Sequence, residues 1–253
     1  MFARALRLSH VSRPARAIAG TRRPHLENAA RAFARRDPEM AEYKTPTDVF
    51  HFWFGQEACS TNAALMDDVA FFRGRCKTLW YAGTSADAAC APFAATIEAA
   101  ASGALDDDPA WASQPDADFA KILLFDQLAR NCFRGTDRAF AYDPLALDLS
   151  LRMCSDLHLL DTAPVGMLHF LSSPLIHSED VDDHDVALEV CSKLERRAPE
   201  LARSSRPHLV AHRDVIVRFG RYPHRNRAMG RENTPEEEAW LASDQVPGWA
   251  KSQ

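Results

Sequence analysis

The sequence has no long hydrophobic run, although 46% of its 253 residues are hydrophobic. The apolar stretch at residues 122–125, for example, ends at Asp126. Since a membrane-spanning helix needs about 20 consecutive apolar residues, we expect no membrane span. A chain of this length and composition is instead expected to bury a hydrophobic core of its own.

The sequence also lacks the short motifs of common cofactor sites. It contains no C-x-x-C pair, phosphate-binding Gly-rich loop, dinucleotide fingerprint or nucleophile motif. We therefore expect no cofactor, and we interpret the cysteines as reduced, mostly buried thiols. The cysteines are Cys59, Cys76, Cys90, Cys132, Cys154 and Cys191.

Two sequence patterns resemble metal-binding motifs but are incomplete. The three aspartates at residues 106–108 lack the alternating ligands and closing Glu of an EF-hand, so a solvated turn is favoured. His208 and His212 are four residues apart, which can place two imidazoles on one ion, but the Glu of the H-E-x-x-H pattern is missing. We expect no bound metal.

Acids are nearly absent from the N-terminus. Residues 1–36 contain nine Arg, no Lys and a single acid, Glu27. This composition is typical of an organelle transit peptide, and arginines interrupt every candidate for the apolar core of a secretory signal. We predict that residues 1–38 are a disordered mitochondrial transit peptide, with the matrix as the favoured destination. The alternative is a basic tail that binds nucleic acid or anionic lipid.

Without this leader the chain is acidic. Removing the net +8 of residues 1–36 from the net −5 of the whole chain leaves −13 for residues 37–253. Non-specific binding to nucleic acid depends on a surplus of Lys and Arg. We therefore expect no nucleic-acid partner.

Strand patterns are also missing, because no segment alternates polar and apolar residues between turns. Apolar residues recur instead at helical spacing, most clearly at residues 116–133, where Asp126 and Arg130 lie four apart on another face. No internal repeat is evident. We predict an all-α antiparallel helical bundle or solenoid over residues 39–244, followed by a tail at residues 245–253.

Local signals predict where several helices begin. Candidate N-cap residues are Thr47, Asn62, Ser178 and Thr234. The signal at Thr234 is the strongest, because Pro235 follows at the first helical position and Glu237 completes a capping box. Pro207 is expected to open another helix.

Several motifs together resemble one known family. They are Phe-Trp-Phe-Gly at residues 52–55, Leu-Phe-Asp-Gln-Leu-Ala-Arg-Asn at 124–131, Phe-Arg-Gly-Thr at 133–136, Ala139-Phe140, Pro174, His-Ser-Glu-Asp at 177–180, His212, residues 218–226, Gly230-Arg231 and Glu237. The chain thus resembles domain of unknown function 924, an all-helical family with a tetratricopeptide-like arrangement, over residues 49–241. The resemblance implies a fold and no established activity.

A first group of polar residues lies on the helix around Asp126 and just after it. The candidate ligand-binding residues are Asp126, Arg130, Asn131 and Arg134. The simpler interpretation is an intrahelical pair of Asp126 with Arg130. Alternatively, these residues face a cleft in which guanidinium groups bind a carboxylate or phosphate.

A second group begins at His177. A helix N-terminus explains Ser178, Glu179 and Asp180, but it does not explain His177. An imidazole beside two carboxylates can serve as a general base or acid. The candidate catalytic residues of the chain are His177, Glu179, His212 and His224.

The third group is residues 218–226, where basic and amide side chains surround Gly220 and Pro223. This glycine can end a helix, and the proline stiffens the turn that follows. The candidate ligand-binding residues are Arg218, Arg221, Arg225, Asn226 and Arg231. They form either an ionic lock with nearby acids or a site for a small anion.

Two functions follow from these groups. The first is a binder of a small anionic ligand, carboxylate or phosphate, with catalysis by histidine acid–base chemistry. The second is a tetratricopeptide-like module that binds a peptide or protein partner in a groove. Unpaired donors around a pocket would support the first function, which loses most of its support if every guanidinium is already paired with a carboxylate.

Overall fold

The computed structural model describes residues 43–55, 68–112 and 116–251, which lie in one unit, Glu42–Gln253. Their regular structure is entirely helical, with no strand among them. The predicted all-α fold is therefore confirmed, and the tetratricopeptide-like arrangement stays a prediction. None of the helices in these ranges has the length and apolar character that crossing a membrane requires. The predicted leader, Asn62 and Cys59 lie outside the described residues.

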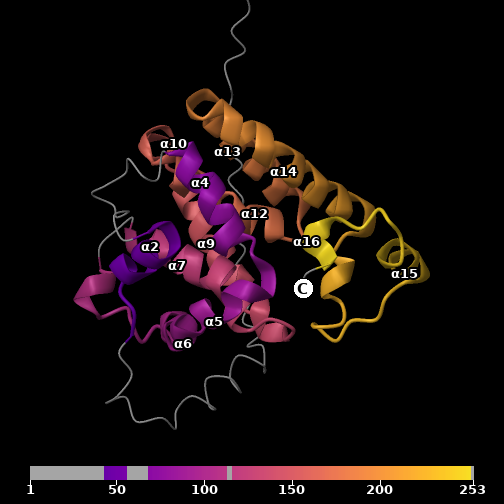
Figure 1. Cartoon of the computed structure of the whole chain (residues 1–253), viewed down its shortest axis with the longest axis horizontal. Helices are drawn as coiled ribbons and strands as arrows, with labels where there is room; N and C mark the ends of the chain where they lie inside the picture. Colours follow the sequence, from indigo (N-terminus) through magenta and orange to yellow (C-terminus); the bar gives the residue numbers. More distant parts are fainter. Residues whose placement is uncertain (1–42, 56–67, 113–115, 252–253) are drawn as a thin grey trace, which may run out of the picture. The chain divides into compact units, whose positions relative to one another are not determined.

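The first half of this unit consists of short helices (Figure 1). In chain order they are α2 (Pro46–Phe54), α4 (Val69–Arg75), η2 (Cys76–Trp80), η3 (Gly83–Ala86), α5 (Asp87–Cys90), η4 (Ala91–Phe93), α6 (Ala94–Ser102), η5 (Pro109–Trp111), α7 (Asp116–Ile122), η6 (Leu123–Leu128), α8 (Ala129–Cys132) and η7 (Asp137–Ala139). The helix predicted at residues 116–133 is confirmed over α7, η6 and α8. Its middle part, η6, is π-helical.

The second half contains the longest helices. In chain order they are α9 (Asp143–Cys154), α10 (Leu157–Thr162), α11 (Val165–Leu171), α12 (Ser173–His177), α13 (Val181–Arg197), α14 (Pro199–Phe219), η8 (Pro223–Arg225), α15 (Pro235–Leu241) and α16 (Gly248–Lys251). The helices α13 and α14 pack side by side along much of their length (Figure 1). Only the residue Ala198 separates them, so the chain reverses its direction there.

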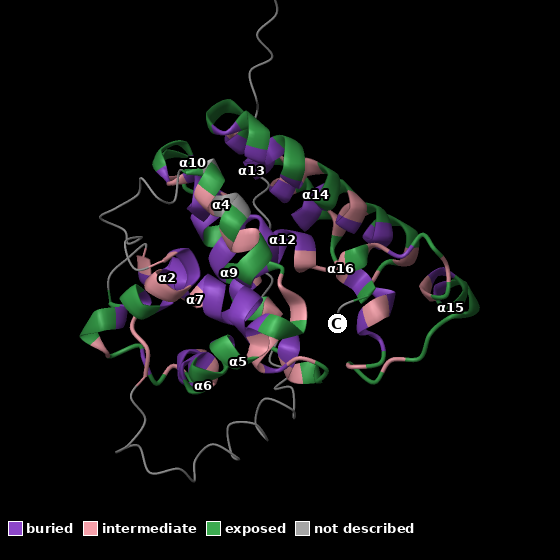
Figure 2. Cartoon of the chain, in the orientation of Figure 1, coloured by how far each residue is buried: buried purple, intermediate pink, exposed green. Residues whose placement is uncertain are grey.

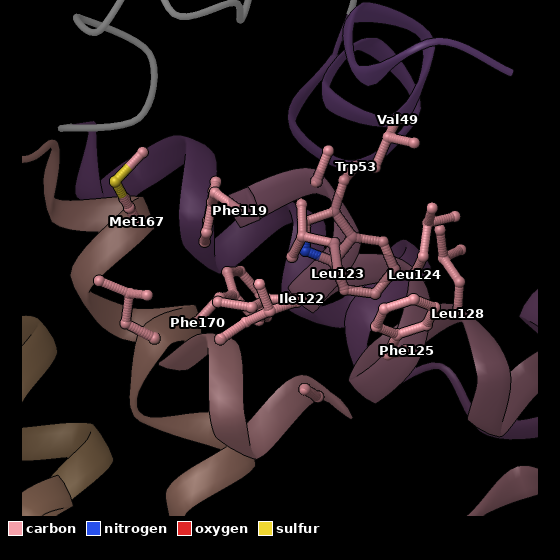
Figure 3. Packing of buried hydrophobic residues seen from close by; sticks show 14 of the residues in the cluster. Val49, Trp53, Phe119, Ile122, Leu123, Leu124, Phe125, Leu128, Met167 and Phe170 are labelled. Carbon is pink, nitrogen blue, oxygen red and sulfur yellow. The ribbon is translucent and has the colours of Figure 1, made fainter. Parts of the chain in front are cut away.

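The main hydrophobic core surrounds α7 and η6. Figure 3 shows Ile122 and Leu123 of this segment among aromatic residues from α2 and α11. The indole of Trp53 meets Phe170 edge-on, with 5.5 Å between ring centroids. Such aromatic contacts add to the burial of apolar area that drives the packing. Helices α7 and α12 are buried along almost their whole length (Figure 2).

A second, smaller core holds the end of the chain. Val215 and Ile216 of α14 pack there with Tyr222 and Trp240. Residues Val246 and Ala250, in the segment predicted as a tail, are also buried in this core. The C-terminal helix α16 is thereby fixed next to α14.

The start of α2 differs from the prediction. Its N-cap is Thr45, whose hydroxyl accepts a hydrogen bond from the backbone N–H of Asp48 at 3.2 Å, and Thr47 lies inside the helix. The carboxylate of Asp48 in turn accepts from the backbone N–H of Thr45 at 2.8 Å. This complete capping box, with Pro46 as first helical residue, favours the earlier threonine.

Two further predicted starts are wrong. Asp180, not Ser178, caps α13, and the hydroxyl of Ser178 donates to the carboxylate of Asp183 at 2.7 Å. Helix α14 begins at Pro199, while Pro207 lies within it. A proline inside a helix removes one backbone hydrogen bond, and here it does not end the helix. The capping box predicted at Thr234 is confirmed.

Gly220 ends α14 in the left-handed conformation, with φ of 68°, as its sequence position suggested. A side chain is strained at this backbone angle, which glycine adopts readily. The turn sends Tyr222 back into the protein, where it is fully buried. Its hydroxyl donates to the backbone carbonyl of Ile176, which holds the segment after α14 against α12.

The described cysteines are free thiols. Cys90, Cys154 and Cys191 are buried, and Cys76 and Cys132 are half-buried. Burial raises the pKa of each of these thiols. They are therefore protonated at neutral pH, as inert structural cysteines are.

Candidate functional site

The centre of the candidate site is a buried carboxylate, Asp126, on the π-helical segment η6. Its side chain has no exposed surface. Oδ1 lies 2.6 Å from Nδ1 of His177, and Oδ2 accepts a hydrogen bond from Nε2 of Gln127 at 2.5 Å. Arg130, one turn later, lies 3.5 Å from Oδ1. The predicted pair of Asp126 with Arg130 thus exists, and a histidine from α12 joins it.

The electrostatics of this group favour an ionised Asp126. Burial alone would raise its pKa, but His177, Arg130 and the hydrogen bonds lower the pKa of Asp126 to about 2. An ionised carboxylate only accepts hydrogen bonds. Nδ1 of His177 must therefore carry the proton that is shared with Asp126.

The remaining nitrogen of His177, Nε2, is consequently unprotonated whenever the ring is neutral. Burial lowers the pKa of His177 and outweighs the opposite effect of Asp126. The ring is thus neutral near pH 7, and Nε2 presents a lone pair. A carboxylate that fixes the tautomer of an imidazole in this way is the arrangement found in acid–base catalysis.

His212 of α14 lies beside His177, with 5.9 Å between ring centroids. Its Nδ1 donates to the backbone carbonyl of His208 at 2.7 Å, so Nε2 is again the unprotonated nitrogen. Burial, followed by the nearby His177, lowers the pKa of His212 well below its ordinary value. The structure therefore brings two of the predicted catalytic histidines together.

The weaker metal hypothesis for His208 and His212 finds no support. The two residues interact through the backbone carbonyl of His208. Within residues 43–55, 68–112 and 116–251, no group of three or more His, Cys, Asp or Glu is placed to hold an ion.

Asp143 at the start of α9 links two predicted arginines. Its carboxylate accepts from Arg130 at 2.9 and 3.2 Å and from Arg225 at 3.0 Å. The guanidinium carbon of Arg225 lies 4.8 Å from the ring centroid of Phe140 and 4.6 Å from that of Tyr222. Asp143 and Tyr222 were not predicted as site residues, although both lie within or beside the motifs that carry the family resemblance.

Arg134 binds an acid that lies far before it in the sequence. Arg134 and Asn131 both donate to Asp87 of α5, at distances from 2.9 to 3.2 Å. Asp87 precedes these residues by more than 40 positions, and no local signal connects it to them. This pair joins α5 to the end of α8.

The remaining arginines connect the loop after α14 to helix ends. Arg231 binds Glu179 at 2.8 and 3.0 Å, and Arg221 binds Glu237 at 2.6 and 2.7 Å. Arg218 pairs with Glu236 on the surface. Asn226 is buried and donates to Asn233 and Glu237. Glu179, predicted as catalytic, also accepts from the backbone N–H of Tyr222 and has the bonding of a structural residue.

His224 lies beside the same two aromatic residues as His212. Its ring is 5.3 Å from Tyr222 and 5.3 Å from Trp249 of α16. Burial, followed by Arg225, lowers the pKa of His224 well below its ordinary value. Its buried Nδ1 has no hydrogen-bond partner among the described residues.

For the candidate arginines, these contacts favour the ionic lock over an open anion site. All the candidate arginines form ion pairs with carboxylates, which is the arrangement of an ionic lock. The arginines concerned are Arg130, Arg134, Arg218, Arg221, Arg225 and Arg231. Of the candidate histidines, His177 contacts the buried carboxylate of Asp126, and His212 lies beside His177.

A surface hollow of about 730 Å³ lies away from Asp126, along α14. Its lining includes Pro199, Pro207 and Val210, with Glu195 of α13 at one side. A second hollow, of about 590 Å³, is lined by residues such as Phe52 and Arg75. In this second hollow, Arg75 is bound to the backbone carbonyl of Trp53 at the end of α2.

Comparison with known proteins agrees with this fold and adds no activity. A solved structure of a protein of unknown function from Agrobacterium tumefaciens is 30% identical to this chain, with a TM-score of 0.52. The match covers 78% of this chain and 96% of that one. A comparison with curated proteins found no match. The family model described as bacterial protein of unknown function (DUF924) matches residues 49–245, and the chain belongs to that family.

Proposed function

We propose that the protein is an enzyme in which His177 transfers a proton to and from a small polar substrate. The observation that carries this proposal is the 2.6 Å contact between Nδ1 of His177 and the fully buried carboxylate of Asp126. In this role, Asp126 orients the ring and stabilises the imidazolium that forms when Nε2 accepts a proton. Hydrolysis and isomerisation are two reaction classes that fit such a group.

The surroundings support proton transfer more than simple charge pairing. An arginine–carboxylate pair explains Arg130 with Asp143, but it does not need a histidine beside it. His177 and His212 both use Nδ1 for a hydrogen bond within the protein, which leaves Nε2 of each ring as the basic nitrogen. Each of these neutral imidazoles, 5.9 Å apart, can act as a general base, and a ring becomes a general acid only after its Nε2 has accepted a proton.

We propose a carboxylate or phosphate as the group that the substrate presents to this site. Arg130 and Arg225 bring two positive charges near His177, and both share Asp143 as a counter-ion. Arg225 is 5% exposed, and its Nε has no hydrogen-bond partner among the described residues. This Nε–H is therefore the donor that we assign to the substrate anion.

The test is a reaction screen in D₂O with mixed small carboxylates and phosphate esters, followed by proton NMR. Consumption of a compound reports hydrolysis or isomerisation, and loss of a C–H signal reports proton exchange with solvent. We expect His177→Gln to reduce the rate by roughly 10²- to 10⁴-fold, the usual contribution of a general acid or base.

The matched control for this screen is His158→Gln, because His158 is an exposed histidine on α10. This control is expected to retain the wild-type rate. A wild-type reaction that survives His177→Gln unchanged would rule out the assigned role. If no compound in either class reacts, the proposed substrate chemistry is wrong.

The second candidate function is binding of a peptide or protein partner, and the hollow along α14 favours it. Val210 lines this hollow and is 40% exposed, and Val217, two turns later on the same helix, is 60% exposed. We expect Val210→Asp to abolish a partner interaction that His177→Gln leaves intact. Affinity capture with both variants separates the two functions, since a partner retained by Val210→Asp does not use this hollow.

A further inference from the structure

Helix α16, at the end of the chain, places an aromatic ring against the proposed site. Trp249 stacks on His212 with 3.8 Å between ring centroids and 15° between the ring planes. The same indole meets Tyr222 edge-on at 5.9 Å and His224 at 5.3 Å. One tryptophan thus contacts two of the histidines that the sequence marked as catalytic candidates.

This position of Trp249 is set by packing on both sides of it. Val246 and Ala250 are 5% and 7% exposed, and both belong to the small core around Ile216 and Trp240. The backbone N–H of Ala250 donates to the carbonyl of Pro247 at 2.9 Å, which closes the turn that carries the indole. Trp249 therefore approaches His212 from an anchored segment.

The stack restricts what His212 can do. One face of the imidazole is covered by the indole, and Nδ1 is bound to the carbonyl of His208. Nε2 is then the nitrogen left for proton transfer, and the ring lies beside His177. A ring held at its face and at one nitrogen keeps a single orientation and tautomer, as a proton-transfer group requires.

We propose that Trp249 is a positioning residue of the candidate site, which holds His212 beside His177 and shields it from water. The inference rests on the proposed function for the catalytic part, while the stack itself is independent of it. The C-terminal segment is then a component of the site, because it supplies the contact that fixes the second imidazole.

Several groups besides Trp249 face His212, and their effects have known directions. Burial is the largest effect and lowers the pKa of His212, and positive charge on His177, His184 or Arg225 lowers it further. The hydrogen bond to the carbonyl of His208 acts in the opposite direction. His224 also lies within electrostatic range, and Tyr222 meets the ring at 6.0 Å. Removing the indole changes the burial and leaves these charged neighbours in place.

The experiment compares Trp249→Ala and Trp249→Phe with the wild-type full chain. Histidine ring signals are followed by NMR as a function of pH, and modification by diethyl pyrocarbonate is quantified for each histidine by mass spectrometry. In Trp249→Ala, we expect His212 to titrate at higher pH and to be modified several-fold faster, while the rate of modification of exposed His158 stays the same. Trp249→Phe is expected to restore most of the wild-type behaviour, because a phenyl ring can still stack on the imidazole.

The outcome for His212 decides the inference. If His212 titrates and reacts in Trp249→Ala as it does in the wild type, Trp249 neither shields nor positions it, and the proposal is overturned. Thermal unfolding followed by circular dichroism shows whether each variant is folded, and Trp249→Leu, which keeps an apolar side chain but has no ring to stack, provides the test if the alanine variant is not. The proposed function is tested separately: it is refuted if His177→Gln reacts at the wild-type rate, and that result says nothing about the stack of Trp249 on His212.

Discussion

The replacement Asp126→Asn tests the central carboxylate through its effect on stability. The substitution keeps the size of the side chain but removes the charge that faces His177 and Arg130. The folded protein lowers the pKa of Asp126 from 3.8 to about 2. At about 1.4 kcal/mol per pKa unit, this shift corresponds to roughly 2–3 kcal/mol of folding free energy at neutral pH.

The same shift fixes how this contribution depends on pH. The pKa of Asp126 is lower in the folded than in the unfolded protein, so the stabilisation is complete above about pH 5. Below that, the stabilisation by Asp126 is lost progressively as the pH falls through the folded pKa of about 2. About half of the stabilisation remains at pH 3. Because the asparagine variant has no such titration, we expect the difference in unfolding free energy between the two proteins to narrow toward low pH.

The measurement is urea-induced unfolding followed by circular dichroism at pH 7, 5 and 3. Asp148→Asn is the control, because Asp148 is an exposed aspartate that pairs with Arg152 on the surface. Its effect is expected to stay within about 0.5 kcal/mol at each pH. A gap between wild type and Asp126→Asn that is below 0.5 kcal/mol at pH 7, or equally large at pH 3, would refute the electrostatic reasoning.

Two further predictions concern the ends of the chain. Glu237→Gln removes the charge that binds Arg221 and weakens the capping box at Thr234, so we expect a loss of about 1–2 kcal/mol in urea unfolding. A loss as small as that of Glu236→Gln, which alters an exposed pair, would contradict this expectation. We also propose that residues 1–38 direct the protein to mitochondria. Fused to a fluorescent protein, they should produce mitochondrial fluorescence, and diffuse fluorescence would exclude a transit peptide.

The sequence predicted the helical fold well where hydrophobic spacing and capping chemistry agreed. The helix at residues 116–133 was predicted from its hydrophobic spacing, and the helix start at Thr234 from its capping box. Both kinds of signal depend only on residues close together in the sequence. Errors occurred where two capping residues lie close together. Thr45 and Asp180 cap their helices, while Thr47 and Ser178 do not, because the backbone ahead of each helix selects the cap and the side-chain type alone does not.

The candidate site was predictable as a set of residues but not as a set of contacts. His177 and Asp126 are 51 positions apart, and they meet at 2.6 Å because α12 and η6 both pack against α9. Asp87 and Asp143 have ordinary helix-start positions in the sequence, so nothing local marks them as partners of arginines. Trp249 was missed because the last residues lack a long helical pattern.

The ionic lock and the proposed catalytic role are compatible. Asp126, Arg130, Asp143 and Arg225 form a continuous series of contacts that joins η6 and α8 to α9 and η8, and His177 brings in α12. Buried pairs of this kind seldom exceed apolar packing in net stability, because removing two charges from water is costly. They do restrict geometry, since each charge must keep its partners. A series that fixes four elements around His177 therefore supplies the precise placement that a general base needs, and its paired arginines are consistent with catalysis.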